Sequence, residues 1–103
     1  MESSAVIASR TFELGRSGHV EVSFFAPVPD GNDWRCDYRI EWPDRTRSYR
    51  AFGIDSVQAL LLAMKAVQAE LTYAPETLNE GLTWLGDADL DLPKSPPEGG
   101  SSS

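Results

Sequence analysis

Three aspartates near the end of the chain have the spacing of calcium ligands. Asp87, Asp89 and Asp91 alternate with other residues, and Glu98 follows at the twelfth position of an EF-hand outline. The sixth position of such a loop must be glycine for the chain to turn sharply, and this chain has Leu92 there. We therefore interpret the acids as a solvated chain end and expect no bound metal and no cofactor.

The single cysteine and the single histidine offer little further chemistry, since a structural zinc site needs several such ligands. Cys36 falls on the buried side of an alternating segment, which favours a packed thiol over a nucleophile. His19 stands beside a turn with no serine or cysteine placed next to it for base catalysis. Because no phosphate-loop, dinucleotide-binding or nucleophile-elbow motif occurs either, we predict no catalytic residue and a protein that is not an enzyme.

Residues 34–42 alternate strictly between apolar and charged side chains. A period of two is typical of a β-strand with one buried and one solvated face. The alternation predicts a strand whose inner face is largely aromatic and whose outer face is charged. The predicted inner set is Trp34, Cys36, Tyr38, Ile40 and Trp42.

The outer face of this strand and of the next one is a candidate binding surface. Arg35, Arg39 and Arg50 stand there beside Asp37 and Glu41. Such charges are either solvated and paired with one another, or they form a docking surface for an acidic partner or RNA. The aromatic side chains that would stack on RNA bases point inward, which argues against RNA.

Three further strands are expected, over residues 6–14, 19–26 and 46–52, from their apolar alternation. The helix- and strand-breaking residues of 27–32 should end the second strand and form a loop. The inward residues predicted for these strands are Val6, Ala8, Phe12, Leu14, Val20, Val22, Phe24, Ala26, Tyr49 and Ala51.

The register of the last hairpin, at Pro43-Asp44, is open between two alternatives. A two-residue loop places Asp37 opposite Arg50, whereas a four-residue loop places Arg39 there. The longer loop is favoured because proline cannot adopt the positive φ of a type I′ turn.

A helix is expected over residues 55–73. Asp55 and Gln58 have the N-cap and N3 spacing of a capping box, the segment is rich in strong helix formers, and Pro75 bounds it. Helical spacing predicts one stripe that lies on the sheet. That stripe comprises Val57, Leu60, Leu61, Met64, Val67 and Leu71.

One helix is too narrow to cover four strands. Four strands spaced about 4.8 Å apart make a sheet about 20 Å wide, whereas a helix covers about 10 Å. The apolar residues of 82–92 can cover the remainder, so we expect this segment to fold back as a short strand or coil beside the helix.

The side of the helix opposite the predicted stripe is also apolar. Ala59, Leu62, Ala66, Ala69 and Tyr73 cluster there. Such a surface is usually covered, either by the C-terminal segment or by another chain. Because small alanines permit the close approach of a second helix, we favour a homodimer through this outer face.

Composition bounds the remaining expectations. With 103 residues and 41% hydrophobic content, we expect one domain over residues 1–92 and a disordered tail over 93–103. The net charge of −7 argues against a nucleic-acid partner. Without a leader peptide, a membrane-spanning apolar run or a second cysteine, we expect a cytoplasmic protein with no membrane contact.

Three segments form a recognisable combination: the stretch Asp33–Ile40 after Pro27-x-Pro29-Asp30, the run GIDSVQAL from Gly53 to Leu60, and LTWLG with DLDLP from Leu82 to Pro93. Together they resemble a small bacterial family that is described as a domain of unknown function. The resemblance covers most of residues 10–93. It implies a bacterial protein with a compact α+β domain, and it brings no activity, substrate or site residues.

The expected fold class is α+β, with an antiparallel four-stranded sheet in ββββα order, one helix across one face and a C-terminal segment completing the core. The leading function is a non-catalytic protein-binding or assembly module, either self-associating as a homodimer or binding another protein. The alternatives are an acidic inhibitor or immunity-type protein that neutralises a basic partner through residues 70–92, and a small enzyme. The candidate interaction residues are Arg35, Arg39, Arg50, Leu62, Ala66 and Tyr73.

Overall fold

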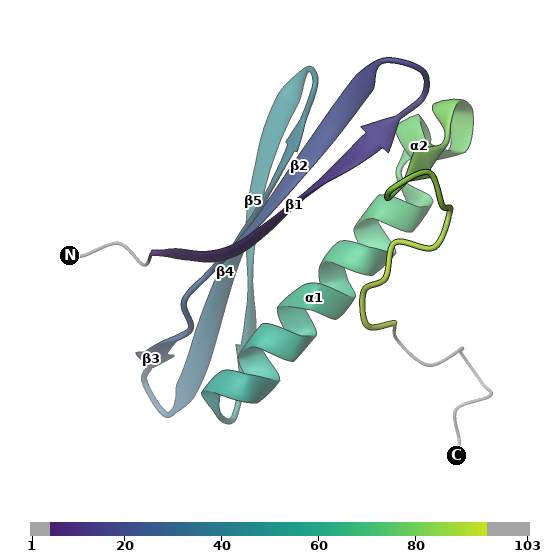
Figure 1. The fold of residues 1–103 in the computed structure, drawn as a ribbon. Helices are drawn as coiled ribbons and strands as arrows, with labels where there is room; N and C mark the ends of the chain where they lie inside the picture. Colours follow the sequence, from purple (N-terminus) through teal and green to yellow (C-terminus); the bar gives the residue numbers. More distant parts are fainter. Residues whose placement is uncertain (1–4, 95–103) are drawn as a thin grey trace.

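In the computed structural model, which describes residues 5–94, an antiparallel sheet lies against one long helix (Figure 1). The α+β class and the antiparallel sheet are confirmed. The expected four strands in ββββα order are wrong, because residues 5–94 form a six-stranded sheet and their elements follow the order βββββααβ. The elements are β1 (Val6–Leu14), β2 (Gly18–Phe25), β3 (Val28–Asp30), β4 (Asp33–Trp42), β5 (Arg45–Gly53), α1 (Ser56–Tyr73), α2 (Pro75–Glu80) and β6 (Leu82–Thr83).

The four long strands form an up-and-down meander in the order β1-β2-β4-β5. The two additional strands are short. β3 pairs with β4 inside the segment that was expected to be a loop, and β6 pairs with the end of β1. Pro29 is tolerated in β3 because, within residues 5–94, this strand pairs with β4 alone. The N–H that proline lacks therefore need not be on the side of β3 that forms hydrogen bonds.

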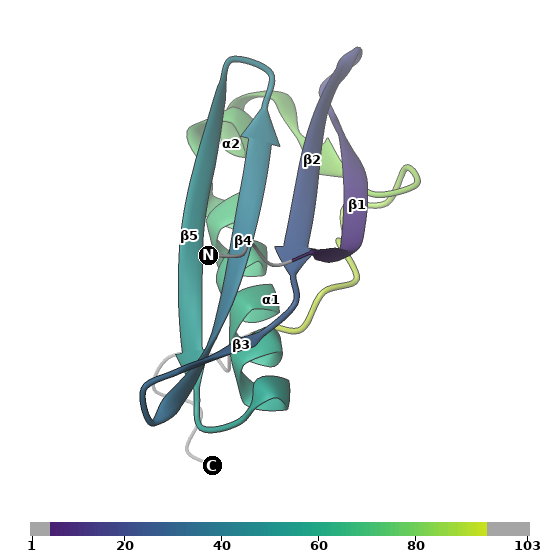
Figure 2. The ribbon, with the colours of Figure 1, turned by 90° about the vertical axis from the view of Figure 1, so that its left-hand side faces the viewer.

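The alternation along β4 is confirmed. Cys36, Tyr38, Ile40 and Trp42 are buried and Trp34 is half-buried, and all five pack in the core cluster or against it. The charged residues between them lie on the opposite, outer face of the sheet and are partly exposed. The inner face therefore carries the core, and the outer face has no covering element among residues 5–94 (Figure 2).

The β4–β5 hairpin has the two-residue loop, so the expectation of a longer loop is wrong. Trp42 pairs with Arg45, and Asp37 pairs with Arg50. Neither Pro43 nor Asp44 has a positive φ. A loop of this length does not require a type I′ turn, and proline suits the first central position of a turn with negative φ values.

Helix α1 begins as its capping residues predict. Asp55 Oδ1 accepts a hydrogen bond of 2.7 Å from the Gln58 N–H, and Gln58 Oε1 accepts one of 2.8 Å from the Ile54 N–H. The reciprocal bond therefore reaches one residue further back than in the usual capping box. Pro75 ends α1 as expected, but it also begins the second helix, α2, which no periodicity predicted.

The stripe of α1 that faces the sheet differs from the predicted one. Its buried residues are Ala59, Ala63, Val67 and Leu71, with Leu60, Met64 and Ala66 packed partly against them. Val57 and Leu61, which were expected in the core, are 71% and 39% exposed, and Ala59, expected on the far side, is fully buried.

Gly53 explains why small residues of α1 face the sheet. A Cβ atom at Gly53 would lie 2.4 Å from the Ala59 backbone nitrogen, so only glycine permits this approach. The start of α1 thus packs backbone against backbone with the end of β5. The small side chain of Ala59 fits this close approach of α1 to β5, and the bulkier Val57 faces away from β5.

Two expectations about the strand faces also need correction or refinement. Val6 and Ala8 are exposed, because the first half of β1 carries a register shift and extends past the helix layer (Figure 1). Tyr49 pairs with Tyr38 and shares its face as predicted, yet Tyr49 remains 37% exposed because β5 is at the edge of the sheet.

The C-terminal segment folds back beside α1, as expected (Figures 1 and 2). We call residues 84–92 the strap. Leu90 is buried and Leu92 packs against the core, while Leu85 is 77% exposed at a turn. A disordered tail was predicted over residues 93–103. From residue 95 onward, this tail lies outside the residues that the structure describes. Neither helix of residues 5–94 has the length and apolarity needed to cross a membrane.

Candidate functional site

The predicted interaction residues lie on two different surfaces. Arg35, Arg39 and Arg50 are on the outer face of the sheet, where each belongs to the outward parity of β4 or β5. Leu62, Ala66 and Tyr73 belong to α1, on the other side of the sheet. The structure therefore keeps the arginine group and the apolar group apart, on opposite sides of the sheet.

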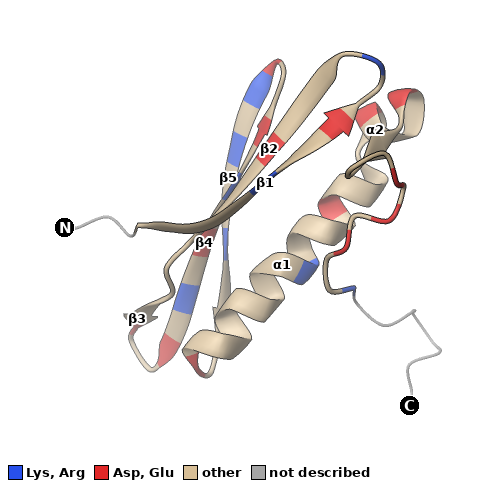
Figure 3. Ribbon diagram, viewed as in Figure 1, with Lys and Arg blue, Asp and Glu red and all other residues tan. Residues whose placement is uncertain are grey.

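The outer face neutralises most of its own charge. Arg35 pairs with Asp30 at 3.3 Å and with Asp37 at 3.0 Å, and Arg39 pairs with Glu41 at 3.1 Å. Blue and red bands accordingly alternate along β4 in Figure 3. Exposed pairs of this kind contribute little energy, so we interpret this face as a solvated surface of paired charges.

The apolar group forms one stripe along α1. Leu62, Ala66 and Tyr73 are separated by four and seven positions, which places them on the same side of a helix. Tyr73 is 74% exposed and Leu62 is 37% exposed, whereas Ala66 packs partly against the core. We call these three residues the α1 stripe.

The edge of the sheet nearest to this helix is β5, which pairs with β4 on one side. α1 packs mainly beneath β4 and β5. The second edge of β5 has no recorded partner among residues 5–94, and its ladder with β4 runs without a register shift over all nine residues. A regular strand of this length with a free edge is a template for pairing with another strand.

A shallow groove of about 350 Å³ lies between β5 and the end of α1. We call this groove together with the free edge the β5 rim. Trp42, Arg45, Arg47 and Tyr49 line the groove on the sheet side. Glu70, Tyr73, Ala74 and Pro75 line it on the helix side.

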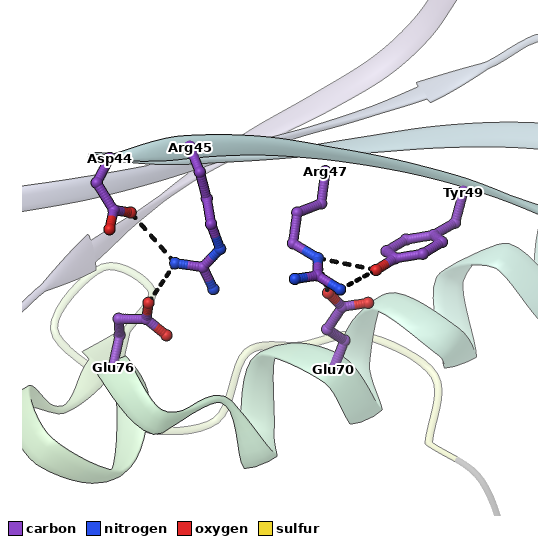
Figure 4. Close-up of polar contacts among 6 residues, drawn as sticks. All are labelled: Asp44, Arg45, Arg47, Tyr49, Glu70 and Glu76. Atoms are coloured by element: carbon purple, nitrogen blue, oxygen red, sulfur yellow. Dashed lines mark hydrogen bonds and ion pairs between the residues drawn. The ribbon is translucent and has the colours of Figure 1, made fainter.

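Arg45 and Arg47 point from β5 toward the helices (Figure 4). The Arg45 guanidinium forms an ion pair with Glu76 and a second one with Asp44 at 3.2 Å. Arg47 donates a 2.8 Å hydrogen bond to the Tyr49 hydroxyl and lies 3.6 Å from the Glu70 carboxylate. Both charges are thus drawn away from the free backbone edge of β5.

The ion pair with Arg45 persists at neutral pH. The hydrogen bond from Arg45 is the largest of the effects that lower the pKa of Glu76 below its ordinary value, and the same bond raises the pKa of Arg45. Glu76 Oε1 and the Trp42 indole N–H are nevertheless buried without a hydrogen-bond partner in the described part of the chain. The ion pair of Arg45 thus lies beside two buried polar atoms that have no hydrogen-bond partner.

Cys36 is fully buried and its thiol donates to the Phe25 carbonyl, while burial raises its pKa to about 11, so the packed thiol is confirmed. His19 is exposed, as expected. Asp87 and Asp89 each accept a 3.0 Å hydrogen bond from the N–H two residues further on. Residues 5–94 contain no cluster of three metal-ligating side chains, and Glu98 lies outside them.

Sequence reasoning missed the roles of several charged residues. Arg45 and Arg47 share the parity of Tyr49, so their inward direction could have been read from β5 itself. Arg10 shares the inward parity of Phe12, and its guanidinium stacks 3.8 Å from the centre of the Trp84 ring. No local pattern indicates that Glu70 and Glu76 are the partners, because α2 was not predicted.

Comparison with known proteins identifies the family. A family model described as a domain of unknown function, DUF6968, matches residues 8–94. The chain belongs to this family. The predicted likeness to a domain of unknown function is therefore confirmed, while a bacterial origin stays a prediction. A search of curated proteins and a search of solved structures each found no match. The β5 rim and the α1 stripe thus belong to the DUF6968 domain itself.

Proposed function

We propose that this DUF6968 domain is a non-catalytic assembly module that forms a homodimer through the β5 rim and the α1 stripe. The observation that carries the proposal is the free edge of β5, a regular strand of nine residues whose two inward arginines are held by Glu70 and Glu76. Charged side chains normally protect an edge strand from pairing. Of the three arginines of β5, Arg45 and Arg47 are neutralised by acidic residues of the same chain.

The sequence of β5 is compatible with pairing to itself. In an antiparallel pair, directly opposite residues face the same side of the sheet, and the register with full overlap centres on Tyr49. That register sets Arg45 opposite Gly53, Arg47 opposite Ala51 and Ser48 opposite Arg50 of the second copy. No arginine directly opposes another arginine, and the two copies of Arg50 lie diagonal to one another, where like charges are further apart than in a direct pair.

Helix packing supports the same arrangement. Paired strands lie about 4.8 Å apart, and packed helices lie about 8–10 Å apart. Because α1 packs beneath β4 and β5, joining two β5 edges brings two copies of α1 within packing range. Their facing surfaces would be the α1 stripes, in which Ala66 permits close approach and Leu62 and Tyr73 supply the apolar area.

The ion pairs and the burial of the thiol support a non-catalytic role. The ionisable groups of the groove are engaged with one another, and the nucleophile Cys36 is sequestered in the core. A cytoplasmic location is part of the proposal, since a fold with one buried thiol gains nothing from an oxidising compartment.

Sedimentation equilibrium of the full chain tests the proposal. The wild type is expected at twice the chain mass. Leu62→Glu should yield the monomer mass, because a carboxylate buried in the seam costs about 3 kcal/mol or more, which weakens the dimer at least ~100-fold. Leu85→Glu is the matched control, since Leu85 is 77% exposed in the strap, and it should leave the dimer intact.

Circular dichroism of each variant separates loss of dimer from loss of fold. A folded monomer for Leu62→Glu supports the proposal. A wild type that sediments as a monomer at all accessible concentrations contradicts it, and so does a dimer that Leu62→Glu leaves unchanged.

A further inference from the structure

The second edge of the sheet is also partly free. β6 covers β1 at Glu13 and Leu14 and then ends. The chain leaves the edge through a tight hairpin in which Trp84 and Asp87 exchange backbone hydrogen bonds and Leu85 and Gly86 both have positive φ. From Val6 to Phe12, the recorded partner of β1 is β2 alone.

This part of β1 carries no free charge that would protect it. Its one charged side chain, Arg10, points inward and donates to the Leu90 carbonyl at 2.8 Å and to the Asp91 carbonyl at 2.9 Å. Val6 and Ile7 are 48% and 49% exposed. An edge with exposed apolar side chains and no free charge is the kind that accepts an added strand.

The surroundings of this edge are acidic. Arg10 ties the strap to β1, and the strap carries Asp87, Asp89 and Asp91 with no basic residue of its own. Figure 3 shows red bands of acidic residues on the coil that passes beside the helix and at the end of β1, and Glu13 is the next-to-last residue of that strand. Lys94 lies 3.9 Å from Asp89 and offsets one of the charges at most.

We propose that β1, from Val6 to Arg10, binds an extended basic segment of another protein as an added strand. Backbone pairing and contact with Val6 and Ile7 would hold its apolar residues, and its lysines or arginines would face the strap. A second copy of this chain does not fit here, because it would bring two acidic straps together. The proposal does not depend on the homodimer, since it concerns the opposite edge of the sheet.

The test uses a synthetic alternating Val–Lys peptide with the full chain, followed by calorimetry and amide exchange. We expect the Val–Lys peptide to bind with an affinity that falls steeply as salt rises. We also expect slower exchange within Val6–Arg10. An alternating Val–Glu peptide should bind at least ~10-fold more weakly, because its charges repel the strap.

Two variants locate the contact. Replacing Asp87, Asp89 and Asp91 together by Asn keeps the oxygens that accept the strap's hydrogen bonds but removes the charge, and should weaken the Val–Lys peptide about tenfold. Ile7→Lys should weaken it similarly, whereas the control Val57→Lys, at an exposed apolar residue of α1, should not.

Three results would overturn the proposal: equal binding of the Val–Lys and Val–Glu peptides, no binding of the Val–Lys peptide, or exchange protection on β5 in place of β1. Because all measurements concern the added peptide, they keep their meaning whether the chain alone is a monomer or a dimer.

Discussion

Arg45 and Arg47 determine the chemistry of the β5 rim. Each sits on the inward parity of an edge strand, where a long side chain can bury its stem and still reach an acid on the helix layer. An arginine in this position leaves the backbone edge beside it unguarded. At the scale of single residues, the ion pairs with Glu70 and Glu76 are therefore what permits strand pairing at β5 in the proposed dimer.

We predict that Glu76→Gln removes a pH-dependent part of the stability. The pKa of Glu76 is lowered below the ordinary 4.5, so its contribution is complete above that pH and is lost as the pH falls through the lowered value. Chemical denaturation should thus show a gap in the free energy of unfolding between wild type and Glu76→Gln at pH 7 that closes in acid.

Glu80→Gln is the matched control, because Glu80 is exposed on the same helix and has no ion pair in the described part of the chain. It should alter the free energy of unfolding little at pH 7. A gap for Glu76→Gln that is equally large in acid would contradict the role assigned to the carboxylate.

At the scale of elements, the register of α1 on the sheet depends on Gly53. The helix has apolar residues on most of its circumference, so helical spacing alone does not identify the buried stripe. Close contact between Gly53 and the Ala59 backbone selects the alanine-bearing side. The buried side of α1 could not be predicted from helix periodicity, because the residue that determines it, Gly53, lies in the preceding strand.

Gly53→Ala should destabilise the fold. The added Cβ meets backbone atoms of Gln58 and Ala59, which cannot move independently, and overpacking of this kind costs about 1–3 kcal/mol. For a domain of this size, the melting temperature should fall by roughly 5–15 °C. Ser48→Ala, at an exposed position of the same strand, should leave it nearly unchanged. A Gly53→Ala variant as stable as the wild type would show that α1 is not held by this contact.

The sequence predicted the long elements well and the short ones poorly. Strict alternation identified β4 and its buried face, and the Asp55 cap identified the start of α1. β3 and β6 have three and two residues, too few for a periodic signal, and they form because neighbouring strands offer free backbone groups. The groove of the rim arises from such non-local contacts, which is why Tyr73 alone of its lining residues was among the predicted interaction residues.

For the whole molecule, the two free sheet edges differ in charge. The β5 edge has neutralised arginines and an apolar helix stripe beside it, which suits a second copy of the chain. The β1 edge lies beside an acidic strap and suits a basic segment. The net charge of −7 is therefore unevenly distributed over the sheet edges, and the two proposed interaction surfaces differ in the charge of the partner that they would bind.

Charge substitutions at Ser48 test the register of the dimer. Ser48→Glu places a carboxylate opposite Arg50 of the second copy, and Ser48→Arg places a guanidinium there. With two such pairs per dimer at about 0.5 kcal/mol each, Ser48→Glu should tighten the dimer about fivefold and Ser48→Arg should weaken it about fivefold. Equal effects of both variants on the dimer dissociation constant would rule out this register.

Disulfide trapping at position 49 is the most direct measurement of the central claim, that two copies join through β5. In the register centred on Tyr49, the two copies of this residue face one another, so oxidation of Tyr49→Cys should yield a covalent dimer on a non-reducing gel. Cys36 is fully buried and does not interfere. Ser48→Cys, one position away, should remain monomeric on the same gel. A monomer for Tyr49→Cys, or equal trapping of both variants, would contradict the account.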